Sequence, residues 1–128
     1  MTPVRLALVE DNPDNRLLVQ AILEDRYDID EYENGVLALE GMAVRVPDLV
    51  LLDISLPEMD GTEVLERMRA DAGLREIPVI ALTAHAMTGD RERFLSLGFD
   101  HYMTKPIVDE EALVGTIEGL LRERRGEG

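Results

Sequence analysis

Residues 49–53 read Leu-Val-Leu-Leu-Asp, a run of four apolar residues followed at once by a carboxylate. A run this short and this uniformly apolar is typical of a strand buried on both faces of a parallel sheet. We therefore expect Leu49–Leu52 to be the central strand, with Asp53 at its carboxyl end. Pro47 ends the element before the run, and Leu56–Gly61 contains the proline and glycine of an irregular loop.

Three further apolar runs also lead into polar side chains. They are Val4–Val9, followed by Glu10 and Asp11; Val79–Leu82, followed by Thr83; and Phe99–Met103, followed after one residue by Lys105 and Pro106. A fifth run, Asp28–Glu33, is polar and alternates only weakly, which suits a strand at the edge of a sheet. In a parallel sheet the carboxyl ends of neighbouring strands meet at one edge. The sequence therefore predicts a reaction site there, with carboxylates, a hydroxyl and an ammonium group.

Segments with helical spacing of apolar residues separate these runs. The expected helices are Pro13 to about Asp25, Gly35 to about Ala43, Thr62–Ala70, Thr88–Leu97 and Glu110–Arg124. The stripe expected to be buried in the first helix is Leu17, Leu18, Ala21 and Ile22, and that of the last is Ala112, Leu113, Ile117, Leu120 and Leu121. Alternating strands and helices predict an α/β fold.

We expect a flavodoxin-like, doubly wound parallel sheet of five βα units with strand order 2-1-3-4-5. The 128 residues are enough for one hydrophobic core and too few for two, which predicts a single domain over residues 1–128. Residues 122–128 are charged and glycine-rich, and we expect them to form a flexible tail.

Composition excludes several classes of function. The formal net charge of −14 disfavours contact with a nucleic acid backbone, so we expect no direct DNA or RNA binding. The absence of cysteine excludes disulfides, thiolate metal ligands and a cysteine nucleophile. No run approaches the roughly 20 apolar residues of a membrane span, and the N-terminus lacks a signal-peptide pattern, so we expect a cytoplasmic protein without membrane contact.

Glu10, Asp11 and Asp53 are expected to share the crevice between the first and third strands. Carboxylates gathered this closely repel one another unless a hard cation such as Mg²⁺ neutralises them. Asp11, Asp53 and the backbone carbonyl of Ser55 could supply oxygen ligands of the kind that Mg²⁺ prefers. The sequence therefore predicts Mg²⁺ as the cofactor.

Asp53 is also the candidate nucleophile of this site. A carboxylate can attack phosphorus and form an aspartyl phosphate. Phosphoryl transfer depends mainly on positioning and on stabilising the phosphoryl oxygens, for which the Lys105 ammonium and the Thr83 hydroxyl are available.

The residues Glu10-Asp11, Asp53, Thr83-Ala84 and Lys105-Pro106, with Pro57 and Gly61 after the aspartate, resemble those of a response-regulator receiver domain over essentially the whole chain. The segment LTAHAMTGD, residues 82–90, most resembles single-domain, cell-cycle-type and hybrid-kinase receivers. The resemblance implies that Glu10 and Asp11 hold Mg²⁺ and that Asp53 accepts phosphate. It also implies that Lys105 and Thr83 contact the phosphoryl group, that the Lys105–Pro106 bond is cis, and that Tyr102 is an aromatic switch.

The resemblance further implies a phosphorelay protein that catalyses only its own phosphorylation and dephosphorylation. Its expected partners are a histidine kinase or a histidine phosphotransferase, and a downstream protein that reads the surface of the fourth helix, fifth strand and fifth helix. A homodimer formed on phosphorylation is an open alternative. His85 follows Thr83 by two residues, and we expect either an exposed loop residue or a side chain that tunes phosphate lifetime.

Other classes use the same architecture. A flavodoxin needs hydroxyl and glycine donors after the first strand, where this chain has Glu10-Asp11-Asn12. A haloacid-dehalogenase-type phosphatase requires a second aspartate at the position of Ser55. A receiver fold that docks partners without phosphorylation, and a receiver cut from a larger regulator or hybrid kinase, stay open as alternatives.

Overall fold

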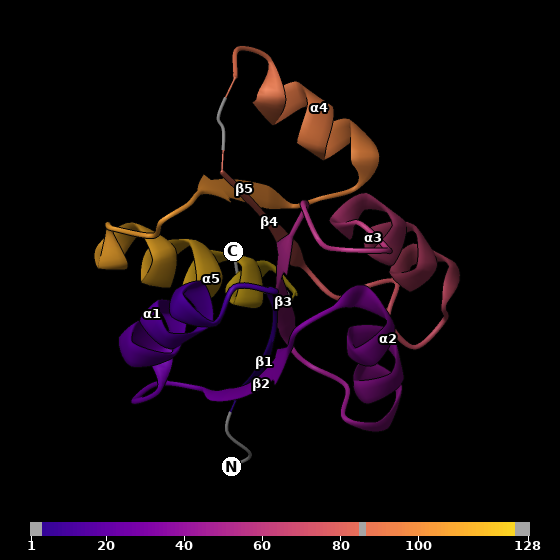
Figure 1. Ribbon diagram of the computed structural model, residues 1–128, viewed down its shortest axis with the longest axis horizontal. Coiled ribbons are helices and arrows are strands. Elements are labelled where there is room, and N and C mark those ends of the chain that lie inside the picture. Colours follow the sequence, from indigo (N-terminus) through magenta and orange to yellow (C-terminus); the bar gives the residue numbers. More distant parts are fainter. Residues whose placement is uncertain (1–3, 85–86, 125–128) are drawn as a thin grey trace.

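The computed structural model describes residues 4–84 and 87–124, and one sheet of five parallel strands in the order β2-β1-β3-β4-β5 lies at its centre (Figure 1). The strands are β1 (Arg5–Val9), β2 (Asp28–Tyr32), β3 (Leu49–Asp53), β4 (Val79–Thr83) and β5 (His101–Thr104). The helices are α1 (Pro13–Leu23), α2 (Gly35–Val44), α3 (Gly61–Ala70), α4 (Asp90–Leu97) and α5 (Glu110–Arg124). The α/β fold and strand order expected from the sequence are therefore confirmed.

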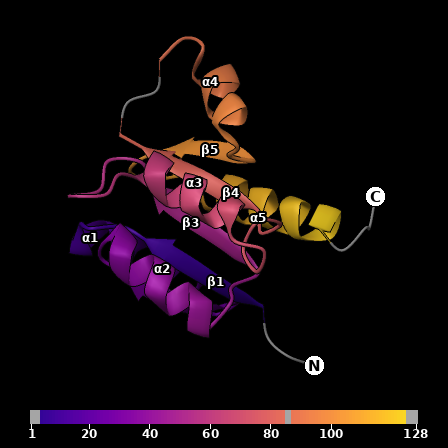
Figure 2. The ribbon, with the colours of Figure 1, turned by 90° about the vertical axis from the view of Figure 1, so that its right-hand side faces the viewer.

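Helices cover both faces of the sheet. Figure 1 shows α1 and α5 on one side of the strands and α2 and α3 on the other, and Figure 2 looks onto α2 and α3. Within β3, Val50 and Leu52 pack in the core that includes residues of α2 and α3, whereas Leu49 and Leu51 pack in the core that includes residues of α1 and α5. Every residue of β3 is buried, which explains why its sequence shows no polar alternation.

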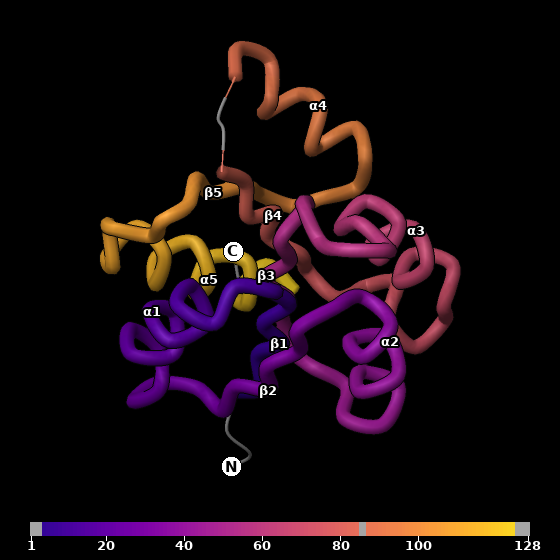
Figure 3. Tube along the Cα trace, in the orientation of Figure 1, coloured from indigo at the N-terminus to yellow at the C-terminus, as the bar shows by residue number. Residues whose placement is uncertain are grey.

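The fourth helix lies beside the edge strand β5, as the trace in Figure 3 shows. Phe94 of α4 is buried and its ring meets that of Phe99 edge-on, with 5.8 Å between ring centroids. β5 begins at His101 rather than at Phe99, and Phe99 lies just before the strand, where its ring packs against that of Phe94. The helix begins at Asp90 rather than Thr88, since Gly89 precedes it with a φ of 87° that does not continue a right-handed helix.

Side-chain caps start the three helices that follow β1, β2 and β3. Asn12 accepts bonds from two backbone N–H groups of α1, Asn34 accepts one from Leu37 at 2.8 Å, and Asp60 accepts one from Glu63 at 3.0 Å. These bonds satisfy N–H groups that have no partner within the helix. The chain is thus turned back over the sheet shortly after each strand, which leaves the strand ends open at one edge.

Gly61 allows α3 to begin against the end of β3. A Cβ atom at this position would collide with the backbone carbonyl of Asp53 and lie 2.7 Å from Cα of Ile54. The backbone N–H of Gly61 donates to the carbonyl of Ile54 at 3.1 Å. The missing side chain therefore lets the loop after Asp53 close tightly.

The buried face of α1 differs from the prediction. The expected stripe was Leu17, Leu18, Ala21 and Ile22. Leu17 is 69% exposed and Leu18 37% exposed, whereas Val19 and Leu23 are buried. Val19 and Leu23 pack in the core beneath the sheet, and on the same side of the helix the guanidinium of Arg16 bonds to backbone carbonyls just after β1. The prediction was therefore wrong for Leu17, Leu18 and Ala21, whereas Ile22 is partly buried and packs against the core as expected.

In α5, Leu113, Ile117 and Leu121 are buried as expected, but Ala112 is exposed. This helix runs to Arg124, so the first part of the segment 122–128 is helical, and residues 125–128 lie outside the described part of the chain. Among the described helices, none has the length and apolar character needed to cross a membrane.

Candidate functional site

Three carboxylates come together at the carboxyl ends of β1 and β3. One oxygen each from Glu10, Asp11 and Asp53 lies within 4.8 Å of the others. Glu10 and Asp53 are each 1% exposed, whereas Asp11 is open to solvent. The parallel pairing of β1 with β3 brings these residues to the same edge, as the sequence predicts.

Lys105 bridges the two buried carboxylates. Its Nζ atom lies 2.7 Å from Oδ2 of Asp53 and 3.1 Å from Oε2 of Glu10. The other Asp53 oxygen, Oδ1, accepts the backbone N–H of Ser55 at 2.8 Å. The Lys105–Pro106 bond is cis, as the resemblance implied. Both oxygens of Asp53 are therefore engaged by donors.

Burial and charge shift the proton equilibria of this cluster. Burial raises the pKa of Glu10, and the neighbouring Asp53 carboxylate raises it further, although the Asn12 N–H and Lys105 partly offset both effects. Burial lowers the pKa of Lys105, but its hydrogen bond and charge attraction to Asp53, together with those to Glu10, outweigh burial and raise that pKa overall. Lys105 therefore stays an ammonium group at neutral pH.

The remaining predicted residues lie at the same edge or beside it. Thr83 is 4% exposed at the end of β4, and its carbonyl accepts the backbone N–H of Lys105 at 2.7 Å. Tyr102 lies in β5 and is partly buried, with its ring centroid 5.3 Å from that of Phe94. His85 lies outside the described residues.

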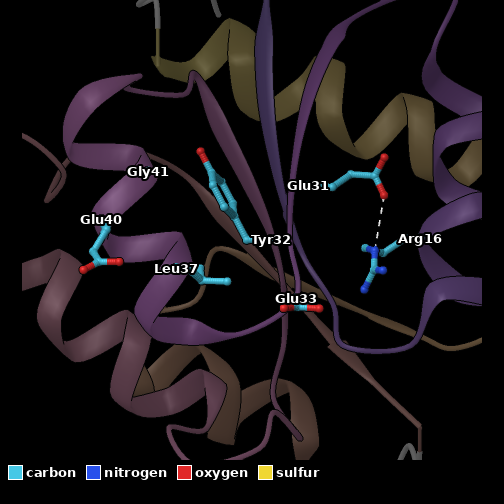
Figure 4. A pocket seen from close by; sticks show the side chains of 7 residues that line it. All are labelled: Arg16, Glu31, Tyr32, Glu33, Leu37, Glu40 and Gly41. Carbon is cyan, nitrogen blue, oxygen red and sulfur yellow. Dashed lines mark ion pairs between the residues drawn. The ribbon is translucent and has the colours of Figure 1, made fainter.

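Arg16 also contacts the backbone of this site, and the sequence did not lead us to predict it. Its Nη1 atom donates to the carbonyl oxygens of Glu10 at 2.7 Å and Asp11 at 3.2 Å. It pairs with Glu31 at 3.3 Å, and Figure 4 shows both side chains among those that line a groove of about 660 Å³ beside β2. The sequence contains a sign of this role. Arg16 lies in the first turn of the expected helix, where the helix dipole disfavours a cation, so its presence there indicates another contact that stabilises it.

The chemistry of the cluster favours a divalent cation held by oxygen. All three clustered acids offer oxygen ligands, and two of them are buried, away from the bulk water that would solvate their charge. Fully ionised, three carboxylates and one ammonium group leave a formal charge of −2. A hard divalent cation matches both the donor type and this charge.

Known proteins are similar to this chain in sequence. The sensor protein GacS of Pseudomonas syringae is 40% identical over 111 residues, which are 84% of this chain and 12% of GacS. The response regulator DivK of Brucella anthropi is 43% identical over 106 residues, which are 82% of this chain and 86% of DivK. The chain thus spans only a small part of one relative and most of the other.

A solved structure has the same fold as this chain. The receiver domain of the sensor histidine kinase PA1611 of Pseudomonas aeruginosa has a TM-score of 0.84 and 32% identity, over 94% of this chain and 98% of that domain. That structure holds a magnesium ion in its active-site cleft. The sequence model of the response regulator receiver domain matches residues 6–118 of this chain. With this match and these relatives, the chain belongs to the family of receiver domains found in two-component response regulators.

Proposed function

We propose that this receiver domain accepts a phosphoryl group on Asp53 and thereby switches its affinity for protein partners. The observation that carries the proposal is the buried Asp53 carboxylate, held by Lys105 at 2.7 Å and flanked by two further acids. A buried carboxylate with a fixed cation beside it has a defined orientation toward an incoming phosphoryl group.

Glu10, Asp11, Asp53 and the backbone carbonyl of Ser55 would hold Mg²⁺. The chemistry that Mg²⁺ supplies when bound is positive charge on the phosphoryl oxygens. The all-oxygen donor set and the formal charge of the cluster support this assignment. The magnesium ion in the related PA1611 receiver supports it as well.

In the transfer step, a carboxylate oxygen of Asp53 forms a bond to phosphorus while the bond between phosphorus and the nitrogen of a donor phosphohistidine breaks. The leaving imidazole keeps the electron pair and takes up a proton. Lys105 stabilises the negative charge of the phosphoryl oxygens, because its ammonium group is already within bonding distance of Asp53. Thr83 donates its hydroxyl to another phosphoryl oxygen once the loop after β4 closes.

The phosphoryl group adds about −1.5 to −2 charge at neutral pH, which shifts an existing equilibrium between two arrangements of the loops. Tyr102 is the proposed aromatic switch, and its present contact with Phe94 links it to α4. Movement of this ring would change the surface formed by α4, β5 and α5, which the downstream partner reads.

The proposed partners are a histidine kinase or histidine phosphotransferase and a downstream protein, acting in the cytoplasm. We infer that residues 1–128 act as one receiver domain. The match to a small part of GacS keeps open a receiver that belongs to a hybrid kinase. A homodimer formed on phosphorylation also stays open.

Intact mass after incubation with acetyl phosphate and Mg²⁺ tests the proposal. We expect one added phosphoryl group of about 80 Da, and its loss both in Asp53→Asn and in the presence of EDTA. An adduct that persists in Asp53→Asn would assign the acceptor to another residue. No adduct in folded protein, with acetyl phosphate or with purified phosphorylated phosphotransferase, would favour a docking module that works without phosphorylation.

A further inference from the structure

The side chain of Arg16 connects three parts of the molecule. It leaves the first turn of α1, donates from Nη1 to the carbonyl oxygens of Glu10 and Asp11, and directs Nε at Oε1 of Glu31 over 3.3 Å. Figure 4 shows Arg16 and Glu31 pointing at each other, with Glu31 extending from β2. The Arg16 side chain is only 20% exposed, so the guanidinium is largely held by these contacts.

The position of Arg16 in the helix is electrostatically unfavourable. The N-terminus of a helix carries partial positive charge, and a cation in the first turn is repelled by it. The two carbonyl oxygens and the Glu31 carboxylate compensate for this repulsion. A guanidinium can bond to several acceptors at once because its donors form a planar fork, whereas a lysine ammonium on a flexible chain cannot reproduce that geometry.

The carbonyls that Arg16 holds belong to the two acids of the cluster. The N–H of Glu10 is fixed separately by the carbonyl of Tyr32 at 3.0 Å. The backbone of Glu10 is therefore held from β2 on one side and from α1 on the other. Each carboxylate side chain starts from a Cα atom whose position the backbone sets. By holding this backbone, Arg16 limits the positions that the carboxylate oxygens of Glu10 and Asp11 can reach.

We propose that Arg16 is a positioning residue for cation binding by Glu10 and Asp11, and that Glu31 holds Arg16 in place. This inference rests on the Mg²⁺ site of the proposed function. The contacts of Arg16 at this site are with the backbone carbonyls of Glu10 and Asp11 and with the Glu31 carboxylate. It acts through the backbone of the two acids.

Geometry and charge predict opposite effects on Mg²⁺ affinity. Arg16 is a positive charge near the acid cluster, so its removal lowers the repulsion of an incoming cation and by charge alone tightens binding. If Arg16 positions the acids, its removal weakens binding instead. The sign of the change therefore separates the two effects.

The test is calorimetric titration of the full chain with Mg²⁺. We expect Arg16→Ala to raise the dissociation constant about tenfold, the lower end of what is typical for residues that orient metal ligands. Arg16→Lys keeps the charge and loses the fork, and we expect a smaller increase of about threefold. Glu31→Gln removes the contact that holds Arg16 and also one negative charge, and both changes weaken cation binding, so we expect an increase at least as large as that of Arg16→Lys.

Arg45→Ala is the matched control. Arg45 follows α2 and pairs with Asp30 of β2 at 3.4 Å, so this variant also removes one positive charge from a contact to β2. We expect its dissociation constant to equal that of the wild type or to be slightly lower. Weaker Mg²⁺ binding in this control would show that general destabilisation explains the Arg16 result, and would overturn the inference.

A second measurement separates positioning from loss of structure. At saturating Mg²⁺, the rate of phosphorylation by acetyl phosphate in Arg16→Ala should return to within about twofold of the wild type, because only binding was impaired. A rate that stays low, or wild-type Mg²⁺ affinity in both Arg16→Lys and Glu31→Gln, would overturn the inference. If the wild type itself fails to bind Mg²⁺, the proposed function fails.

Discussion

The ammonium nitrogen of Lys105 lies 2.7 Å from Oδ2 of Asp53, although the two residues are 52 positions apart in the sequence. The same nitrogen lies 3.1 Å from Glu10, 95 positions away. One cation thus occupies the space between two buried carboxylates. Any other cation that binds these acids meets repulsion from it.

Lys105→Met should therefore separate binding from chemistry. We expect tighter Mg²⁺ binding, since a competing cation is lost, and phosphorylation about 100-fold slower, since the phosphoryl oxygens lose a fixed positive charge. Calorimetric titration and the time course of the mass adduct measure the two effects. Weaker Mg²⁺ binding combined with an unchanged phosphorylation rate would contradict this account of Lys105.

Glu10→Gln should stabilise the fold at neutral pH in the absence of Mg²⁺. Burial, and then the Asp53 carboxylate, raise the pKa of Glu10, so the folded state favours the protonated acid. A raised acid pKa contributes stability below the pKa of the unfolded chain, and this contribution is lost as the pH rises through the folded pKa. We expect the gain in melting temperature at pH 7 to shrink as the pH falls toward the ordinary pKa of glutamate. A gain that is independent of pH would point to packing instead.

Asp60→Ala should cost about 1 kcal/mol of unfolding free energy, because α3 loses its N-cap. The Thr62 hydroxyl and the Glu63 N–H lower the pKa of Asp60, so its contribution is present above the pKa of the unfolded chain and is lost as the pH falls through the folded pKa. Urea unfolding at pH 7 and at acid pH measures both. Asp60→Asn is the control, and it should retain most of the cap at pH 7.

Gly61→Ala should destabilise the protein by about 2 kcal/mol, since the added Cβ collides with the carbonyl of Asp53 and must displace the start of α3. Because that carbonyl belongs to the phosphoacceptor candidate, phosphorylation should slow as well. Gly115→Ala in α5 is the matched control. A Cβ there meets nothing within 4 Å, and we expect a gain of about 0.5–1 kcal/mol. Equal effects in urea unfolding would contradict the steric explanation.

The sequence predicted the strands and the meeting of the acids well, for a physical reason. Asp53 ends an apolar run, and Glu10 directly follows another, so the order of the strands alone brings them together. The contact of Lys105 with both Asp53 and Glu10 was harder to predict from the sequence. It depends on the path of the chain after β5, which no local pattern specifies.

The spacing of the apolar residues of α1 did not predict which face of this helix is buried. Leucines at 17 and 18 and a valine at 19 offer two overlapping stripes, and a count of apolar positions favours the wrong one. The stripe that is buried contains Val19 and Leu23, and Arg16 lies on the same side of the helix.

The backbone hydrogen bond from the N–H of Lys105 to the carbonyl of Thr83 couples the movements of these two residues. Thr83 ends β4 and Lys105 directly follows the last residue of the neighbouring strand β5, so both lie at the same edge of the sheet. An inward shift of Thr83 must either break this 2.7 Å bond or pull the backbone of Lys105 with it. A shift of the Thr83 backbone is therefore passed to Lys105, and through Lys105 to the chain that leads into α5.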